Sequence, residues 1–242
     1  MLVYQEKARA RIKENVSAIR SQCKKGIKTN MGEADTRAIV RRVLIDCLGW
    51  DEFSDVTQEE AVKGGYCDYM VRHEGRPYFV VEVKKVSGGL RESHLMQASA
   101  YAQNKGLQWV LLTNGDEWQA YNLYYVKKRG ANPLPELFHV FTTSFTDTNI
   151  PAPERIELLY LLSKEACKKN ELGAYHERLQ ALSPQNLVSR ILRKDVIDRI
   201  RIGIKNDIDY KIENAELAER LLEVFRDEAV PPNVSRLVKK LK

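Results

Sequence analysis

The sequence of 242 residues lacks the long apolar runs that would place it in a membrane. Its longest apolar stretches, YFVVEV at 78–83 and WVLLT at 109–113, are far shorter than the roughly 20 residues that a transmembrane helix needs. The amino-terminal stretch MLVYQEKARARIKENV has no apolar core of the kind found in secretory signals. The sequence therefore predicts no membrane-spanning segment and no secretory signal.

Cysteine is scarce and scattered in this chain. The four cysteines lie far apart and form no C-x-x-C motif, which excludes a disulfide framework and a zinc site of the usual spacing. The four histidines are equally scattered, without the spacing of metal ligands. A reducing cytoplasm is therefore the expected location. These residues are Cys23, Cys47, Cys67 and Cys167, and His73, His94, His139 and His176.

Two kinds of catalytic machinery are also missing. The chain has no G-x-x-x-x-G-K-[ST] motif, so any ATP-driven translocation would need another protein. No Ser/His/Asp or Cys/His nucleophile arrangement stands out, so the chemistry is not expected to use one.

What the sequence does have is an ordinary globular composition with a basic excess. At 43% hydrophobic and 30% charged residues, it can build one large domain or two small ones. The net charge is +6, and the segment 7–28 carries eight Lys or Arg against a single acid, Glu14. Such a run either neutralises phosphates or forms the solvated face of a helix, and the pattern alone leaves both open.

The apolar pattern predicts an α/β domain over residues 1–148 and a helical domain over residues 149–242. Between them, DTNIPAP at 147–153 has two prolines and no periodicity. Helices are expected over about 3–22, 32–48 and 90–104, an edge strand within 51–62, and further strands at 66–73, 77–83, 108–113, 119–126 and 136–143. The helical segments expected after the break are 155–168, 172–182, 183–204, 214–227 and 234–241, with Ser183 and Pro184 as a helix start.

The segment 64–85, GGYCDYMVRHEGRPYFVVEVKK, predicts a hairpin whose second strand is apolar enough to be central in its sheet. Glu82 and Lys84 then point to the same face, and antiparallel pairing brings Asp68 beside Glu82. Two converging carboxylates suit a hard divalent cation such as Mg²⁺. The spacing alone equally fits a structural salt bridge of Lys84 with either acid, so both interpretations stay open at this point.

The order of the motifs extends this pattern beyond the hairpin. GEADTR on an early helix is followed by CDY and EVKK on successive strands, QASAY on the next helix, and then LLTNGDEWQAY. This order resembles the PD-(D/E)XK nuclease superfamily, and most closely the N-terminal nuclease domain of type I restriction enzyme R subunits and related stand-alone restriction endonucleases. The resemblance covers roughly Met31 to Tyr125, with Cys67 in place of the motif's proline. It implies a restriction-endonuclease-like core, a mixed central sheet flanked by helices, followed by the helical C-terminal domain.

The resemblance also implies roles for particular residues. Asp68 and Glu82 would ligate Mg²⁺ or Mn²⁺, and the backbone carbonyl of Val83 would complete the protein's share. Lys84 would orient and help deprotonate the attacking water, or steady the charge on the phosphate. Glu33 would reach the site from the preceding helix and hold a water or a second cation.

Four further residues are implied or suggested, one of them at the catalytic site and three as DNA contacts. Gln97 and Tyr101 match a Q-x-x-x-Y signature, and their spacing puts both on one helix face. Gln97 would hydrogen-bond near the active site, and Tyr101 would meet the DNA backbone. Lys85 and Arg91 are either phosphate contacts or solvated surface charges.

The expected function is therefore a divalent-metal-dependent DNA endonuclease of restriction or defence type. The alternative is a non-cleaving nucleic-acid-binding or assembly module of a restriction complex. The expected partners are DNA, restriction-system subunits and a second copy of the chain. RNA or branched DNA as the substrate stays open.

Overall fold

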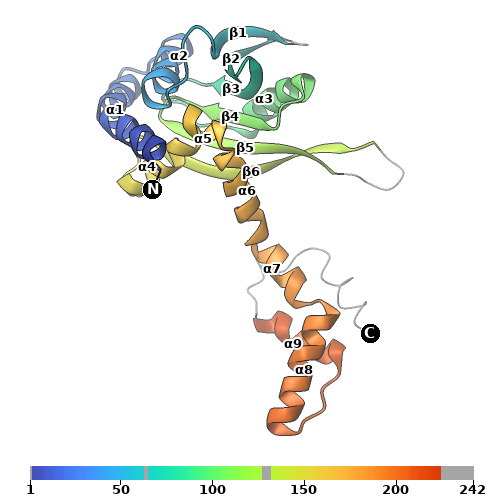
Figure 1. The fold of residues 1–242 in the computed structure, drawn as a ribbon. Coiled ribbons are helices and arrows are strands. Elements are labelled where there is room, and N and C mark those ends of the chain that lie inside the picture. The colour runs from blue at the N-terminus through green and yellow to red at the C-terminus, as the bar shows by residue number, and fades with distance from the viewer. Residues whose placement is uncertain (1, 63–64, 127–131, 225–242) are drawn as a thin grey trace. The chain divides into compact units, whose positions relative to one another are not determined.

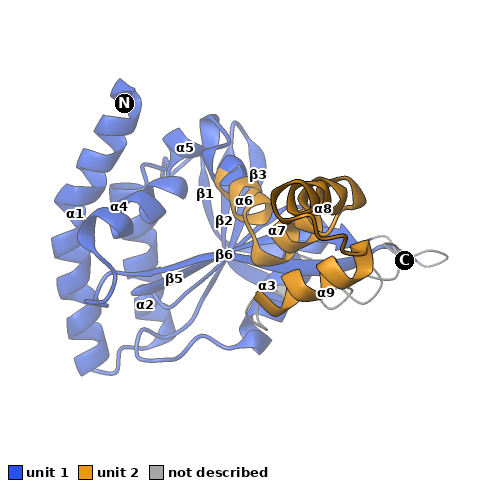
Figure 2. Cartoon of the chain, turned by 90° about the horizontal axis from the view of Figure 1, so that it is seen from below, with its two compact units in different colours: residues 1–174 blue, residues 175–242 orange. Residues whose placement is uncertain are grey.

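The computed structural model describes residues 2–62, 65–126 and 132–224 (Figure 1). The chain divides into two compact units, unit 1 with residues 1–174 and unit 2 with residues 175–242 (Figure 2). The domain boundary that the sequence predicts after residue 148 stays a prediction. Unit 1 also takes in the first helices that follow this boundary.

Three expected features lie outside the described residues. They are Gly64 at the start of the hairpin, the end of the expected helical segment 214–227, and the last expected helix at 234–241.

The elements follow one another as the apolar pattern predicts. The sequence opens with α1 (Val3–Lys28), α2 (Glu33–Arg42) and a short π-helix, η1 (Val43–Cys47). The strands are β1 (Val56–Val62), β2 (Gly65–His73), β3 (Arg76–Val83), β4 (Trp109–Thr113), β5 (Glu117–Val126) and β6 (Leu134–Ser144), with α3 (Glu92–Lys105) between β3 and β4. The later helices are α4 (Ala152–Leu161), α5 (Lys164–Lys168), α6 (Glu171–Ala181), α7 (Pro184–Ile191), α8 (Lys194–Ile208) and α9 (Asn214–Val224).

The six strands form one sheet in the order β1-β2-β3-β4-β5-β6. Neighbouring strands are antiparallel except for β3 and β4, which are parallel and are joined by the crossover helix α3. A parallel pair needs such a long connection, whereas the antiparallel pairs need only turns. The expected fold class, an α/β protein with a mixed central sheet flanked by helices and a helical C-terminal region, is confirmed.

The predicted hairpin is formed by β2 and β3. Its turn uses Glu74 and Gly75, both in the left-handed region with φ of 51° and 76°, which suits a two-residue hairpin turn. Val80, Val81 and Val83 are completely buried, as expected for a strand in the middle of a sheet.

The two faces of β3 pack against different parts of unit 1. Val80 joins the apolar cluster beneath α3, together with Val110 of β4 and Ala98 of α3. Phe79 points to the opposite face, where Trp50 packs edge-on against its ring at a centroid distance of 6.0 Å. Because strand side chains alternate, Glu82 shares the face of Val80 and lies on the α3 side of the sheet.

Helix α2 is held over the end of β3 by Thr36. The Thr36 hydroxyl donates to the Gly32 carbonyl at 2.8 Å and accepts from the backbone N–H of Val86 at 3.0 Å. Gly115, in the tight turn between β4 and β5, allows this approach because a Cβ there would lie 3.2 Å from the Thr36 methyl group. Its φ of 83° also favours glycine. The start of α2 is thereby fixed beside the polar end of the hairpin.

Two expected helical segments are each divided in the structure. Within 155–168 the chain breaks at Ser163, whose hydroxyl accepts from the Ala166 N–H and starts α5. Within 183–204 the chain breaks at Arg193, whose extended backbone starts α8. Ser183 caps α7 as predicted, since its hydroxyl accepts from the Asn186 N–H.

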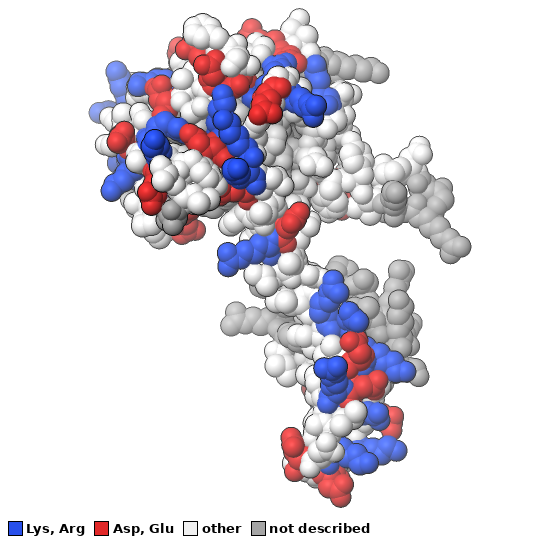
Figure 3. Space-filling model, in the orientation of Figure 1, with Lys and Arg blue, Asp and Glu red and all other residues white. Residues whose placement is uncertain are grey.

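Unit 2 has a small apolar core of its own. It is formed by α7, α8 and α9 and contains the buried residues Val188, Leu192, Ile197, Leu217 and Ala218. Figure 3 shows Lys and Arg interspersed with Asp and Glu over the drawn face of this unit. No patch of a single charge sign dominates the face that is drawn.

The basic run of α1 is partly used inside unit 1. Arg9 binds Glu157 through two hydrogen bonds, and Arg11 binds Glu165 in the same way. Bidentate pairs of this kind fix the orientation of the guanidinium group. Part of the run therefore fastens α1 to α4 and α5 and is not available for phosphates.

Arg155 fastens the segment that follows the sheet. Its side chain is 2% exposed and donates to the carbonyls of Ser144, Asp147 and Ile150. We expect Arg155→Met to lower the free energy of unfolding by about 3 kcal/mol, because three backbone carbonyls lose a charged donor that is itself buried. Urea denaturation followed by tryptophan fluorescence measures this, since all three tryptophans lie in unit 1. The exposed Arg76→Met is the control, and an equal loss in both variants would contradict the assignment.

Candidate active site

Glu82 and Lys84 form a buried ion pair at the end of β3. The Glu82 residue is 2% exposed, and the Lys84 ammonium donates to its carboxylate at 2.7 Å. The Lys84 side chain is 17% exposed, so one end of the pair reaches solvent. The backbone N–H of Lys84 donates to the Thr113 carbonyl at 2.8 Å, which continues the β3–β4 pairing and fixes the position of the lysine.

Burial sets the protonation of this pair. It raises the pKa of Glu82 to about 7, because removing the carboxylate from water outweighs the opposing hydrogen bond and charge of Lys84. Burial would lower the pKa of Lys84, but the hydrogen bond and charge of Glu82 outweigh it and the pKa is raised. Lys84 therefore stays cationic at neutral pH, while Glu82 is poised between its two forms.

Asp68 lies at the point where β2 and β3 part. The last paired residues of this ladder are Tyr69 and Val81, and one step further the Asp68 carboxylate accepts from the backbone N–H of Val83 at 2.8 Å. Its side chain is 11% exposed. The charge of Asp68 is also one of the causes that raise the pKa of Glu82. The hairpin thus brings Asp68 and Glu82 together, as the register predicts, while their role as ligands stays a prediction.

Helix α2 adds two charged residues to this site. Glu33, in its first turn, lies 3.9 Å from the Lys84 ammonium. One turn later, Arg37 pairs with Asp68 at 3.0 Å and with Glu59 of β1 at 3.1 Å. Each of the two cations therefore joins two carboxylates, and we call the six side chains the ion-pair network.

The charge of the ion-pair network fits a divalent cation. Four carboxylates face two cationic side chains, which leaves two formal negative charges beside a carboxylate that burial already disfavours. Across the described parts of the chain, no three His, Cys, Asp or Glu side chains gather as a ready metal cluster. Magnesium does not need one, because it keeps several waters and binds proteins through one or two carboxylates. The carboxylates are Glu33, Glu59, Asp68 and Glu82, and the cations are Arg37 and Lys84.

The other predicted site residues lie on or near α3. The Gln97 amide donates to the Tyr101 hydroxyl at 3.1 Å, so the two form a pair on one helix face. Tyr101 is 7% exposed and its ring belongs to the apolar cluster beneath α3, which leaves its hydroxyl as the group able to meet a ligand. Lys85 and Arg91 are exposed at the two ends of the segment between β3 and α3. Their roles toward DNA stay predictions.

Three residues near the site escaped the sequence analysis. Arg37 follows Glu33 at the i, i+4 spacing of one helix face, and this signal could have found it. Glu59 sits in the left-handed region with φ of 51°, a conformation that no sequence pattern here indicates. His94, whose ring accepts from the Arg91 N–H, lies close enough for the charges of Lys84 and Arg91 to act on its pKa, which burial chiefly lowers.

Comparison with known proteins finds a family model that matches the part of the chain carrying the site. Residues 32–137 match the family model of the type I restriction enzyme R protein N terminus. The expected resemblance to these N-terminal domains is confirmed. No curated protein and no solved structure matches the chain. Within the described residues, no helix combines the length and the apolar character needed to cross a membrane.

The R protein N-terminal match covers the part of unit 1 that carries the site. It begins just before Glu33 and extends beyond Tyr101, so every predicted site residue lies inside it. It includes the sheet from β1 to the start of β6, and it leaves out α1 and all of unit 2. The match supports a role in a restriction system.

Proposed function

We propose that this protein is a divalent-metal-dependent DNA endonuclease of a restriction system, with a PD-(D/E)XK active site. The observation that carries the proposal is the ion-pair network inside the family-matched residues, in which Lys84 pairs with Glu82 and Glu33. In the same network Arg37 holds Asp68, whose charge acts on Glu82. A structural salt bridge alone would need only one acid for each cation. Here each cation meets two acids, and one of these acids is almost completely buried.

Asp68 and Glu82, with the carbonyl of Val83, would hold Mg²⁺ or Mn²⁺. The bound cation supplies positive charge that polarises the phosphodiester and stabilises the charge of the transition state. Asp68 is oriented for this role by the Val83 N–H and by Arg37, which fix its two oxygens. Because each carboxylate oxygen can accept more than one bond, both contacts are compatible with a ligand role.

Lys84 would act as a cation in this reaction. Its raised pKa favours the protonated form, so its ammonium donates hydrogen bonds to the phosphate as negative charge builds there. Of the two roles that the sequence leaves open for Lys84, the structure supports this one. Glu33, whose side chain is 44% exposed, has room to accept a hydrogen bond from the attacking water. Gln97 and the Tyr101 hydroxyl would hold the DNA strand beside the site, and Lys85 and Arg91 would contact phosphates.

A second candidate function is a non-cleaving DNA-binding or assembly module. The observation in its favour is that all four carboxylates of the ion-pair network already have a cationic partner. In this case DNA binding would be salt-sensitive and would survive the loss of Asp68.

Cleavage of DNA by the purified full-length chain tests the proposal. We expect nicking or linearisation of plasmid DNA with Mg²⁺ or Mn²⁺, no reaction in EDTA, and a rate at least about 100-fold lower in Asp68→Asn. Asp46→Asn is the matched control, because Asp46 lies in η1 and pairs with Arg42, outside the ion-pair network. Cleavage by Asp68→Asn at the wild-type rate would remove the assignment. DNA binding without cleavage under any metal would select the second candidate.

A further inference from the structure

A cavity of about 430 Å³ opens beside Asp68. This volume lies within the range of about 300–1,000 Å³ that is typical of small-ligand sites. Its walls are formed by Arg37 of α2, Glu59 of β1, and Tyr66, Cys67 and Asp68 of β2. Asp68 belongs to both the cavity and the ion-pair network. Whatever occupies the cavity therefore lies next to the proposed site of cleavage.

Tyr66 gives this cavity an aromatic face. It is 66% exposed and precedes Asp68 by two residues, so both side chains leave the same face of β2. By contrast, Trp109 of β4 and Trp118 of β5 are 5% and 1% exposed and serve the core. An exposed ring beside a polar cavity is available for stacking.

The polar walls offer a donor and acceptors at short range. Both ion pairs of Arg37 use Nη1, and in the described part of the chain no hydrogen bond is made by its Nη2 or Nε. Glu59 presents its carboxylate to the same guanidinium nitrogen that binds Asp68. Cys67 adds a neutral wall, because burial raises the pKa of its thiol to about 11. Two carboxylates in the walls disfavour a phosphate inside the cavity, whereas the edge of a base carries both donors and acceptors.

We propose that this cavity binds one unpaired nucleobase of the DNA strand being cut, with the base stacked on Tyr66 and its edge bonded to Arg37 and Glu59. The inference rests on the proposed function, since it takes DNA as the ligand of the neighbouring site. A base reaches such a cavity only after leaving the duplex stack. The protein therefore binds strands that are already unpaired more tightly than intact duplex.

Binding of a fluorescein-labelled single-stranded DNA oligonucleotide to the full-length chain in EDTA tests this inference without cleavage. We expect Tyr66→Ala to raise the Kd by about 5- to 50-fold, and Tyr66→Phe to stay within about twofold of wild type, because phenylalanine keeps the ring face. Fluorescence anisotropy gives both values. Tyr66 is largely exposed, so neither variant is expected to disturb folding.

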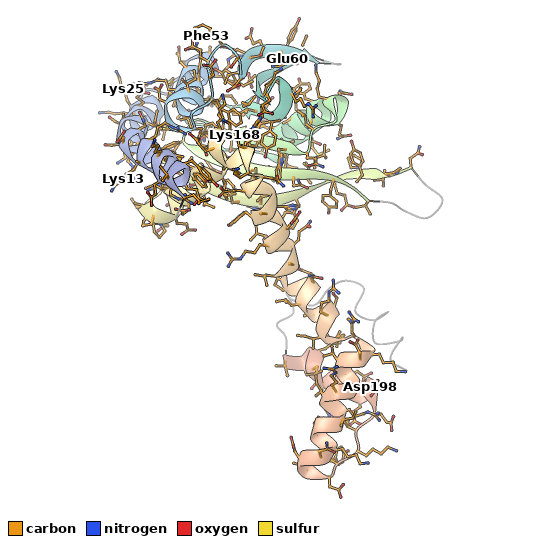
Figure 4. The ribbon with its side chains drawn as sticks, in the orientation of Figure 1. Lys13, Lys25, Phe53, Glu60, Lys168 and Asp198 are labelled. Atoms are coloured by element: carbon orange, nitrogen blue, oxygen red, sulfur yellow. The ribbon has the colours of Figure 1, made fainter. Side chains whose placement is uncertain are left out.

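Phe53→Ala is the matched control, because Phe53 is 92% exposed in the turn before β1 (Figure 4). It is not among the residues that line the cavity. An unchanged Kd in Tyr66→Ala, an equal loss in Phe53→Ala, or no binding of single-stranded DNA by wild type would overturn the inference. Dependence on Tyr66 seen only with an RNA oligonucleotide would overturn DNA as the ligand. Binding that depends on Tyr66, together with no metal-dependent cleavage, would reject the proposed nuclease and keep the cavity.

Discussion

Glu82→Gln is expected to abolish DNA cleavage and, at the same time, to stabilise unit 1 at pH 8. The variant loses a charge that the proposed cation needs, so the cleavage rate should fall by at least about 100-fold. It also removes the cost of ionising a carboxyl group that is 2% exposed. Replacing a residue that serves only to pack the core would not lower the cleavage rate and raise the stability at the same time.

The pH dependence of the folding stability is expected to identify Glu82 as the source of this cost. Its pKa is raised in the folded protein to about 7, whereas an exposed glutamate ionises near its ordinary value. The protonated carboxyl therefore favours folding fully below about pH 4.5, and this contribution is lost as the pH rises through about 7. The loss amounts to about 3 kcal/mol at pH 8. Glutamine has no such loss, so the stability difference between variant and wild type should grow from pH 5 to pH 8.

Urea denaturation at both pH values, followed by tryptophan fluorescence, measures this difference. The control is Glu136→Gln, because Glu136 is an exposed residue of β6 that bonds to the Tyr124 hydroxyl. The difference in stability between Glu136→Gln and wild type should be the same at pH 5 and pH 8. A stability difference for Glu82→Gln that does not change with pH would show that Glu82 ionises normally.

Lys84→Met is expected to abolish cleavage and to destabilise unit 1 at pH 8. Methionine keeps the length of the side chain but leaves the Glu82 carboxylate buried without its cation. Removing one partner of a buried pair costs about 3–5 kcal/mol, although Glu82 limits this cost by taking up a proton. At pH 5, where Glu82 is already protonated, the penalty should shrink. Urea denaturation and plasmid cleavage measure the two effects.

The double variant Glu82→Gln, Lys84→Met removes both charges of the pair and tests whether an unpaired buried charge causes the loss of stability. It should recover most of the stability that Lys84→Met loses, because no unpaired buried charge remains, while cleavage stays absent. Lys168→Met, a change at an exposed position of α5, is the control for loss of a lysine. If Lys84→Met were as stable as wild type at pH 8, the pairing of Lys84 with Glu82 would contribute nothing to the fold.

Much of the fold follows from local sequence patterns. The hairpin of β2 and β3 was predictable because apolar runs flank a turn centred on Gly75, and the face shared by Glu82 and Lys84 follows from strand alternation. The cap at Ser183 likewise depends only on neighbouring residues. The position of Asp68 at the end of β3 needed one further step, the register of an antiparallel pair.

Other features depend on contacts between distant segments or on local caps and backbone conformations, and the apolar periodicity indicates neither. Arg37 reaches Asp68 only because Thr36 and Gly115 hold α2 against the turn after β4. The left-handed backbone at Glu59 is a local conformation, and the alternation of side chains in β1 did not indicate it. Residues 155–168 read as one apolar helical segment, and the break at Ser163 appears only once its hydroxyl caps a new turn.

The parallel pairing of β3 and β4 has a consequence for the order of folding. Within β1–β3 and within β4–β6, each strand pairs with the strand that follows it closely in the sequence, whereas β3 meets β4 only after the chain closes the longer loop through α3. Closing a longer loop costs more entropy, so the two three-stranded halves are expected to form before they dock. Glu82 becomes buried only on docking, because Leu112 of β4 lies beside it. Near pH 6 the late step of folding should therefore take up a proton, because the carboxyl group of Glu82 is buried in that step.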